Sequence, residues 1–583
     1  MRDILRASHS PAKGFLVARN AANCEVCKIG DGRHGGFHYC ARMFPAWIFA
    51  FVSGVLLALC YVPVGWSDLC WVALVPLICA AWLLRPSPRW NGLRLGALGF
   101  LFGAAYFGGS LFWLTTLTAP GWIVLSLYLS IYPALWMVFI GTVARPSGED
   151  RSGRPVWLSS LHNLRFCALG AAAWVALEWL RGVVFPQFPW NNVGIALSEK
   201  TALIQIADLT GVGGISFLVV MANLMLVATV KRLVLELRRG VRRPHYDFAI
   251  TVALIALAWT YGIRQMFAPP PASVEFSFAS VQANIPQNVR NDLTFESDVM
   301  ARYAQYTETA MAMKPDLLLW PESSTPRPLF NDQGTWDIVR GLAERHEGDF
   351  LLGTVHFSEQ GDYNSVAFLS DHAKEAQMYH KNHLVPFGEY VPFRSAFPLF
   401  AWVVGDLVPD DFDPGPYPVV FEMSTRPVKI GPLICFEDVL GDLARQFALR
   451  GAQVFAVVTN DGWFLKSAGP RQHLAHAVFR CAENKLPMLR SANTGITCVV
   501  DRCGRVGQTL QSESGDTFIE GVLIGKVSAP LHPVPTFYAR NGEVFSIACL
   551  IISSLAAAVF LIRLWKIKNS ACPSPSETKA LER

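Results

Sequence analysis

Long apolar stretches dominate the first half of the chain and return once near its end. A helix needs about 20 mostly apolar residues to cross the hydrocarbon core of a bilayer. Seven stretches of roughly this length lie within residues 44–267, and an eighth follows residue 543. The pattern therefore predicts a membrane part of about seven helices, followed later by one returning helix. The expected spans are 46–65, 69–84, 95–114, 122–144, 166–185, 211–230, 248–267 and 544–565.

Residues 268–540 have a different pattern, in which short apolar runs alternate with stretches of helical periodicity. Short apolar runs between turn signals are typical of buried strands, whereas apolar residues three and four positions apart indicate amphipathic helices. This alternation predicts an α/β domain with a substantial sheet. The expected strands are 273–279, 316–320, 350–355, 428–435 and 454–459, and the expected helices are 299–313, 336–346, 439–450 and 472–484.

The charged residues are few and are placed as membrane topology requires. They make up 16% of the chain, against about 25% in typical soluble proteins. Arg and Lys gather in residues 1–42, in the loops after the second, fourth and sixth expected spans, and after residue 562. Because basic loops stay in the cytoplasm, we expect residues 268–540 outside the cytoplasm and residues 566–583 in the cytoplasm. This placement accounts for the net charge of +5 without a nucleic-acid partner.

Residues 1–43 lack an apolar core and are expected to form a disordered cytoplasmic extension. Met43 stands immediately before the first apolar stretch, so translation starting there is an alternative. The extension contains cysteines and histidines, but their spacing matches no closed zinc site. We therefore expect neither a metal nor a cofactor. The residues concerned are Cys24, Cys27, His34, His38 and Cys40.

Three ionisable side chains stand at the ends of strand-like segments. Glu322 follows Pro321, which cannot continue a hydrogen-bond ladder and so ends a strand. Cys435 lies where an apolar strand runs into a helix, close to backbone N–H groups that favour a thiolate. Alone, each would be a packed or solvated residue, and so would Lys381. Together, a carboxylate, a cation and a thiol on one rim of a sheet predict a nucleophile with its base and a supporting charge.

Four motifs carry these residues: Trp320-Pro-Glu322, Lys381, Gly388-Glu-Tyr-Val-Pro392 and Cys435-Phe-Glu437. With them the domain resembles the nitrilase superfamily, which has a Glu–Lys–Cys triad and an αββα sandwich fold. With its seven preceding helices and one following helix, the chain resembles the membrane-bound members of that superfamily, the apolipoprotein N-acyltransferases. The resemblance covers nearly all of residues 44–565. Further matching stretches are Phe188-Pro-Trp190, 211–217, 281–287, 460–464 and Ala492-Asn-Thr-Gly495.

The resemblance implies that residues 268–540 are a catalytic domain on the periplasmic side of a bacterial inner membrane. It also implies that the reaction is the transfer of an acyl chain from a lipid. An acyl chain would move from a membrane phospholipid to the N-terminal amine of diacylglyceryl-cysteine in apolipoproteins, through a cysteine thioester. The resemblance implies Glu322 as general base, Cys435 as nucleophile and Lys381 as the cation beside the oxyanion. The supporting site residues are Glu389, Glu437 and Phe436. Two positions depart from the family pattern, because Phe436 stands where Tyr is frequent and Arg290-Asn291 stands where a Lys-Trp pair is frequent.

Two other functions remain open from the sequence. A membrane-tethered amidase would use the same triad on a small soluble amide, although one helix would suffice as a tether. A transporter or sensor would carry an inactive outer domain. Transporters usually place ionisable residues within their spans, and here the expected spans hold few, mainly Glu178 and Asp208.

Three smaller features have plain interpretations. His473 and His476 lack a carboxylate at metalloprotease spacing and are expected to pack or to form hydrogen bonds. Cys498 and Cys503 are expected to be free thiols. An aromatic, proline-rich stretch is expected to dip towards lipid near the active site. Its apolar residues are Phe387, Tyr390, Val391, Phe393, Phe397, Phe400 and Trp402.

Overall fold

The structure is a computed structural model that describes residues 35–83, 91–146, 155–290, 292–392, 394 and 411–570. Asn291 and the side chains of the five possible zinc ligands lie outside this description. Phe393, Phe397, Phe400 and Trp402, which were expected to dip towards lipid, lie outside it as well.

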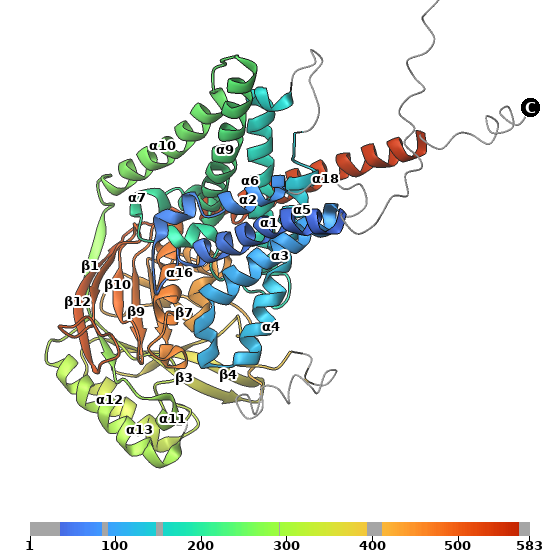
Figure 1. The fold of residues 1–583 in the computed structure, drawn as a ribbon. Helices are drawn as coiled ribbons and strands as arrows, with labels where there is room; N and C mark the ends of the chain where they lie inside the picture. Colours follow the sequence, from blue (N-terminus) through green and yellow to red (C-terminus); the bar gives the residue numbers. More distant parts are fainter. Residues whose placement is uncertain are drawn as a thin grey trace, which may run out of the picture.

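Helices occupy all eight expected span positions (Figure 1). Among the described residues, five helical segments are long and apolar enough to cross a membrane, namely Ala119–Thr142, Ser160–Val183, Val212–Arg239, Tyr246–Met266 and Val544–Asn569. Large apolar side chains point outwards from them, such as Leu257, Leu555 and Leu561, as a lipid environment requires. The predicted multi-helix membrane part is confirmed. Its main helices are α1 (Gly35–Ala58), α3 (Asn91–Ser110), α4 (Ala119–Leu129), α5 (Ile131–Thr142), α6 (Ser160–Val183), α9 (Val212–Arg239), α10 (Tyr246–Met266) and α18 (Val544–Ser570).

The second expected span is a broken segment instead of a continuous helix. It consists of a 3₁₀ turn, η1 (Ser67–Trp71), and a short helix, α2 (Val75–Leu83). The break leaves backbone groups without helical partners, and the buried amide of Asn223 on α9 satisfies two of them. Its nitrogen donates to the carbonyl oxygen of Cys70 at 2.8 Å, and its oxygen accepts from the backbone N–H of Leu74 at 3.0 Å. Irregular backbone at membrane depth is tolerated where protein groups pair with it in this way.

Two helix ends differ from the expected boundaries. The first helix begins at Gly35, within the stretch expected to be an extension. Helix α9 continues past residue 230 to Arg239 because the basic residues there find partners. The buried Arg232 pairs with Glu236 at 2.9 Å on the same helix and with Asp247 of α10 at 3.0 Å. The helix then ends at Gly240, whose φ of 64° suits a left-handed C-cap.

The outer domain contains two six-stranded sheets. The first has the order β12-β1-β2-β3-β4-β5 and the second β11-β10-β9-β8-β7-β6. All five expected strands are present, as β1, β2, β3, β7 and β8, whereas β4, β5, β6 and the strands after β8 were not among those expected. The first sheet comprises β1 (Ser273–Gln282), β2 (Leu317–Leu319), β3 (Asp349–Ser358), β4 (Gly361–Ser370), β5 (Glu375–His380) and β12 (Gly521–Pro530). The second comprises β6 (Phe421–Glu422), β7 (Lys429–Ile434), β8 (Val454–Thr459), β9 (Met488–Ala492), β10 (Cys498–Val500) and β11 (Val506–Thr509).

Alternate side chains along a strand face opposite sides of the sheet, and this explains how the layers of the outer domain pack. On β2, Leu317 and Leu319 face the second sheet and join the core shared with Leu433 of β7, whereas Leu318 faces the other way. Leu318 packs in a separate core with residues of α12 (Glu296–Met311) and α13 (Gln333–Arg345), which cover the outside of the first sheet. On the second sheet, α15 (Gly441–Leu449) and α16 (Gly469–Asn484) follow the strands, and α16 lies beside the membrane helices (Figure 1). The predicted αββα sandwich is confirmed.

Candidate active site

The three predicted catalytic residues each follow the end of a strand. Glu322 comes three residues after β2, Lys381 directly after β5 and Cys435 directly after β7. Glu322 and Lys381 are 7% and 1% exposed, so both charges lie in the protein interior. Since β2 and β5 belong to one sheet and β7 to the other, the sandwich brings the two sheets' rims together at this point.

Lys381 lies between two carboxylates. Its Nζ is 2.8 Å from Oε2 of Glu389 and 3.8 Å from Oε1 of Glu322. Burial by itself lowers the pKa of Lys381, but the charges of Glu389 and Glu322 outweigh this and raise the pKa above its usual range. The ammonium is therefore protonated at any physiological pH. Asn364 of β4 donates at 2.8 Å to both Glu322 and Glu389, which fixes the spacing of the two carboxylates.

Cys435 has a strained backbone and a thiol whose pKa is raised. Its φ is 52°, in the left-handed region that costs an ordinary residue about 1–2 kcal/mol. Burial raises the pKa of the thiol, the Glu322 carboxylate raises it further, and Lys381 acts in the opposite direction. The three predicted residues therefore lie close enough for their charges to act on one another. A neutral thiol needs a base before it can attack, and Glu322 is the carboxylate whose charge acts most strongly on this thiol.

Glu437 links the ends of two strands. It is fully buried and accepts hydrogen bonds from the Tyr379 hydroxyl at 2.9 Å, from the backbone N–H of Asn382 at 2.7 Å and from that of Ile434 at 2.9 Å. Burial raises its pKa to about 7, while Lys381 and these hydrogen bonds oppose the rise. Because Asn382 follows Lys381 and Ile434 precedes Cys435, Glu437 holds the cation and the thiol next to each other.

Phe436 contacts the membrane part. Its ring stacks on Trp190, with 6.1 Å between centroids and 10° between planes, and on His383 with 6.0 Å between centroids. Trp190 lies in the loop that follows α6. At the position where the family often has Tyr, this chain therefore makes a packing contact.

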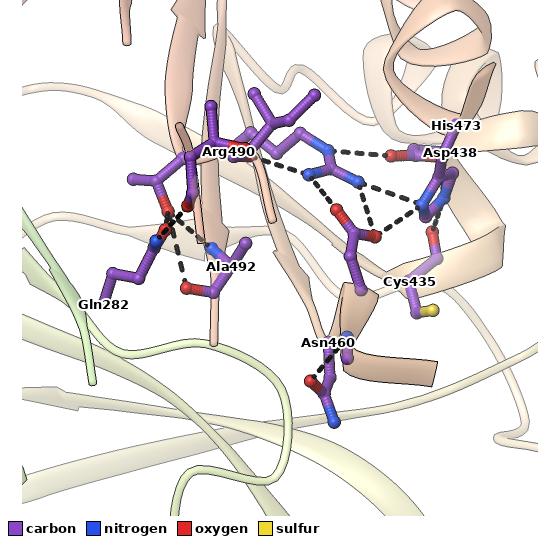
Figure 2. Close-up of polar contacts among 12 residues, drawn as sticks. Gln282, Cys435, Asp438, Asn460, His473, Arg490 and Ala492 are labelled. Carbon is purple, nitrogen blue, oxygen red and sulfur yellow. Dashed lines mark hydrogen bonds and ion pairs between the residues drawn. The ribbon is translucent and has the colours of Figure 1, made fainter. Parts of the chain in front are cut away.

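A buried ionic cluster supports the backbone of Cys435 (Figure 2). His473 Nε2 lies 2.7 Å from Asp438 Oδ1 and 3.3 Å from the Cys435 carbonyl oxygen, and His473 Nδ1 lies 3.1 Å from Asp461 Oδ1. Arg490 reaches Asp461 at 3.0 Å. Burial by itself lowers the pKa of His473, but Asp438 and Asp461 outweigh it and raise the pKa to about 9. The imidazolium form donates a hydrogen bond towards the strained turn.

Sequence reasoning assigned His473 a packing or hydrogen-bonding role, which the structure confirms, but it missed the partners. Asp461 lies in the matching stretch 460–464 and Asp438 directly follows the motif Cys435-Phe-Glu437, and acidic residues within apolar surroundings are a signal that could have pointed to them. Asn364 and Arg490 gave no such signal, because their partners are distant in sequence. Cys498 and Cys503 are buried free thiols, as expected. Among the described residues, no group of three His, Cys, Asp or Glu side chains is arranged to hold a metal.

The predicted lipid-facing loop is described in part. Phe387 is 38% exposed, and Tyr390 is half-buried. Val391 is 3% exposed and belongs to the core, so the expectation that it faces lipid is wrong. Its backbone N–H donates to Asp411 at 2.9 Å, which turns this part of the chain inwards. A separate groove of about 590 Å³ lies where Phe112 and Trp113 of the membrane part face Lys466, Arg471 and Phe518.

Comparison with known proteins agrees with this geometry. Residues 53–225 match the model of the apolipoprotein N-acyltransferase N-terminal domain, and residues 277–530 match that of carbon-nitrogen hydrolases. An apolipoprotein N-acyltransferase of Geobacter metallireducens is 34% identical over 530 residues, which cover 88% of this chain and 95% of the relative. The chain belongs to the apolipoprotein N-acyltransferase family. It is therefore a membrane protein and an acyltransferase.

Other relatives give the same result. An apolipoprotein N-acyltransferase of Nitrosomonas europaea is 30% identical over 513 residues, which cover 84% of this chain and 93% of that protein. Among solved structures, a CN-hydrolase superfamily protein of Xanthomonas campestris is 17% identical, covers 44% of this chain and 91% of its own, and has a TM-score of 0.33. The alternative of a small-amide amidase is not favoured, because the relatives match the membrane helices as well as the outer domain.

We expect Gly353→Ala to impair the acyltransferase through Glu322. A Cβ at Gly353 on β3 would lie 2.5 Å from the Pro321 carbonyl oxygen and 2.6 Å from the Glu322 Cα, so the Glu322 backbone must shift. Displacements of this size cost about tenfold or more in rate. The measurement is kcat for acyl transfer from phospholipid to a diacylated lipopeptide. Gly341→Ala in α13, which meets nothing within 4 Å, is the control and should keep wild-type kcat. A Gly353→Ala enzyme with wild-type kcat would contradict the predicted placement of Glu322.

We also expect His473 to make stability depend on pH. Its pKa in the folded protein is about 9, above the ordinary value of 6.5, so its protonation stabilises the fold fully below pH 6.5. This contribution is lost as the pH rises through 9. The difference in melting temperature between wild type and His473→Gln should therefore shrink between pH 6.5 and pH 10. A difference that stays constant over this range would show that His473 is neutral in the folded enzyme.

Proposed function

We propose that this acyltransferase moves an acyl chain from a membrane phospholipid to the N-terminal amine of diacylglyceryl-cysteine in apolipoproteins, through a thioester on Cys435. The observation that carries the proposal is the set of buried Glu322, buried Lys381 and half-buried Cys435 at the rims of two facing sheets. The membership of the chain in this family supports the choice of substrates.

The first half-reaction loads the enzyme. Glu322 removes the thiol proton of Cys435, and the sulfur attacks the carbonyl carbon of the phospholipid ester. The carbonyl oxygen becomes an oxyanion, which the Lys381 ammonium stabilises. When the intermediate collapses, the carbon–oxygen ester bond breaks. The lysophospholipid leaves with the proton that Glu322 returns, and the acyl group stays on sulfur as a thioester.

The second half-reaction uses the same groups in the reverse roles. The neutral amine of the apolipoprotein attacks the thioester carbonyl carbon while Glu322 accepts a proton from nitrogen. Lys381 again lies beside the oxyanion. The carbon–sulfur bond then breaks, the amide product leaves and the thiolate is reprotonated by Glu322. No cofactor or metal is required, since proton transfer and charge stabilisation come from side chains.

The supporting residues keep this arrangement in place. Glu389 binds Lys381 at 2.8 Å and accepts from the backbone N–H of Val385 at 2.8 Å, so it fixes both the cation and its loop. Glu437 joins the loops of Lys381 and Cys435. Phe436 packs against the membrane part and places the loop after the nucleophile at the lipid side of the domain.

The proposed location is the bacterial inner membrane, with domain 268–540 in the periplasm. The basic residues before the first helix and after residue 562 support this orientation. In this arrangement 44–267 and 544–565 span the membrane, and 1–43 and 566–583 face the cytoplasm. Exposed Trp66 and Phe112, near the outer ends of α1 and α3, suit the interface between lipid chains and headgroups.

We expect phospholipid alone to load an acyl group onto the enzyme, and neutral hydroxylamine to release it, because thioesters are more labile than amides. Cys435→Ala should abolish loading. Lys381→Ala should slow it about a hundredfold or more, because the oxyanion loses its cation. Glu322→Gln keeps the shape but loses basicity, so it should slow both half-reactions. Mass spectrometry of the intact protein measures loading, and lipopeptide acylation measures the full reaction.

One result would overturn this mechanism. If Cys435→Ala still acylates the lipopeptide, the amine attacks the phospholipid directly and Cys435 is a packing residue. Exposed Lys374, which pairs with Asp371 on the surface, provides the matched control for the lysine substitution. Lys374→Ala should load at the wild-type rate.

We expect reporter fusions to place residues 268–540 outside the cytoplasm. A reporter active only in the periplasm should work when fused after Phe267, and a reporter active only in the cytoplasm should work after Lys568. The reason is the alternation of basic loops along the membrane part. A cytoplasmic location for either the residue 267 fusion or the residue 300 region would refute the proposed topology and the reaction with it.

A further inference from the structure

The membrane part reaches the nucleophile turn through Trp190. This side chain is 2% exposed and lies in the loop between α6 and the 3₁₀ turn η4 (Val193–Leu197). One face of its ring stacks on Phe436, the residue after Cys435. The ring also contacts His473 and His476 of α16, with 5.7 Å and 5.0 Å between centroids. Trp190 therefore touches both the nucleophile turn and the helix that carries His473.

Gln472 fixes Trp190 in this position. Its side-chain oxygen accepts from Trp190 Nε1 at 2.9 Å, from Trp113 Nε1 at 3.0 Å and from Asn191 Nδ2 at 3.1 Å. Its nitrogen donates at 2.9 Å to the carbonyl oxygens of Val62 and Ser110. All five partners belong to the membrane part, and Gln472 itself is 2% exposed on α16 of the outer domain.

The next residue along α16 acts on the nucleophile. His473 Nε2 lies 3.3 Å from the carbonyl oxygen of Cys435, whose φ of 52° requires support from its surroundings. Successive residues on a helix point about 100° apart, so Gln472 faces the membrane part while His473 faces the cluster of Asp438 and Asp461. A displacement of the first turn of α16 would move both contacts together.

We propose that Gln472 and Trp190 are positioning residues for acyl transfer, through which the membrane helices hold Cys435 and Phe436 in the reactive geometry. This proposal rests on the proposed function, because it takes Cys435 as the nucleophile. Neither residue touches the reacting atoms. Gln472 holds the start of α16 and therefore His473 against the Cys435 carbonyl, and Trp190 holds Phe436. On this proposal, the outer domain is fully active only when it is docked on the membrane helices of the same chain.

The full-length enzyme in nanodiscs provides the test. Gln472→Met removes the five hydrogen bonds at similar volume, and Trp190→Phe keeps a ring over Phe436 but removes the N–H donor. Both should lower the single-turnover rate of acyl loading about tenfold or more, with the KM for phospholipid changed less than about twofold. Alkylation of Cys435 by iodoacetamide, followed by peptide mass spectrometry, should slow in parallel. Because Gln472→Met already breaks the hydrogen bond that Trp190→Phe removes, the double variant should be slowed by less than the product of the two single effects.

Gln205 offers a matched control at the same interface. It is fully buried in the membrane part and joins the outer domain through the Cys503 carbonyl oxygen at 2.8 Å and through Lys485 at 2.7 Å, at the far end of α16. Gln205→Met should lower the melting temperature as Gln472→Met does, because it also breaks buried hydrogen bonds between the two parts. It should leave the loading rate and Cys435 alkylation as in the wild type.

The outcomes separate this proposal from the one on which it rests. If Cys435→Ala is inactive while Gln472→Met and Trp190→Phe load as fast as Gln205→Met, the positioning role is wrong and the nucleophile stands. If Cys435→Ala still transfers the acyl chain, the nucleophile itself is wrong. If Gln472→Met does not fold, Trp190→Phe decides alone, and wild-type loading by that variant overturns the proposal.

Discussion

The candidate active site is arranged around one buried positive charge, the ammonium group of Lys381. An ammonium removed from water is stable only with close anionic partners, and Lys381 has two, of which Glu389 makes direct contact and Glu322 lies farther away. This asymmetry leaves the Glu322 carboxylate less tightly paired than that of Glu389, as its proposed role as the base requires. Asn364 keeps the two carboxylates apart at a fixed distance from both. The rims of the two sheets are thus organised around the compensation of a single charge.

The second constraint is that one chain must satisfy two solvents. In the membrane part, outward side chains are apolar and polar groups turn inwards, as the pairing of Arg232 with Glu236 and Asp247 illustrates. In the outer domain, apolar side chains form the buried core instead, as in water-soluble proteins. At the junction of the two parts, buried amides such as Gln205 and Gln472 pair hydrogen-bonding groups of the membrane part with groups of the outer domain.

Much of this architecture follows from the sequence because it is encoded locally. Apolar run lengths predict the spans, and Pro321 and the apolar strand before Cys435 predict where the catalytic residues stand. The cluster of Asp438, Asp461 and Arg490 is different, because it depends on how β7, β8 and β9 pair. The register of parallel strands fixes which side chains meet across the sheet, and no local pattern reveals it. The break at residues 72–74 is hidden for the same reason, since the compensating Asn223 lies on a distant helix.

The raised pKa of the Cys435 thiol also bears on the durability of the enzyme. Peroxides and disulfides react with thiolates far faster than with neutral thiols. A cysteine that is protonated at rest is therefore a poor target for oxidants. Burial likewise raises the pKa of Cys498, to about 12, and that of Cys503. At the proposed location outside the reducing cytoplasm, this protonation would slow oxidation of the proposed nucleophile.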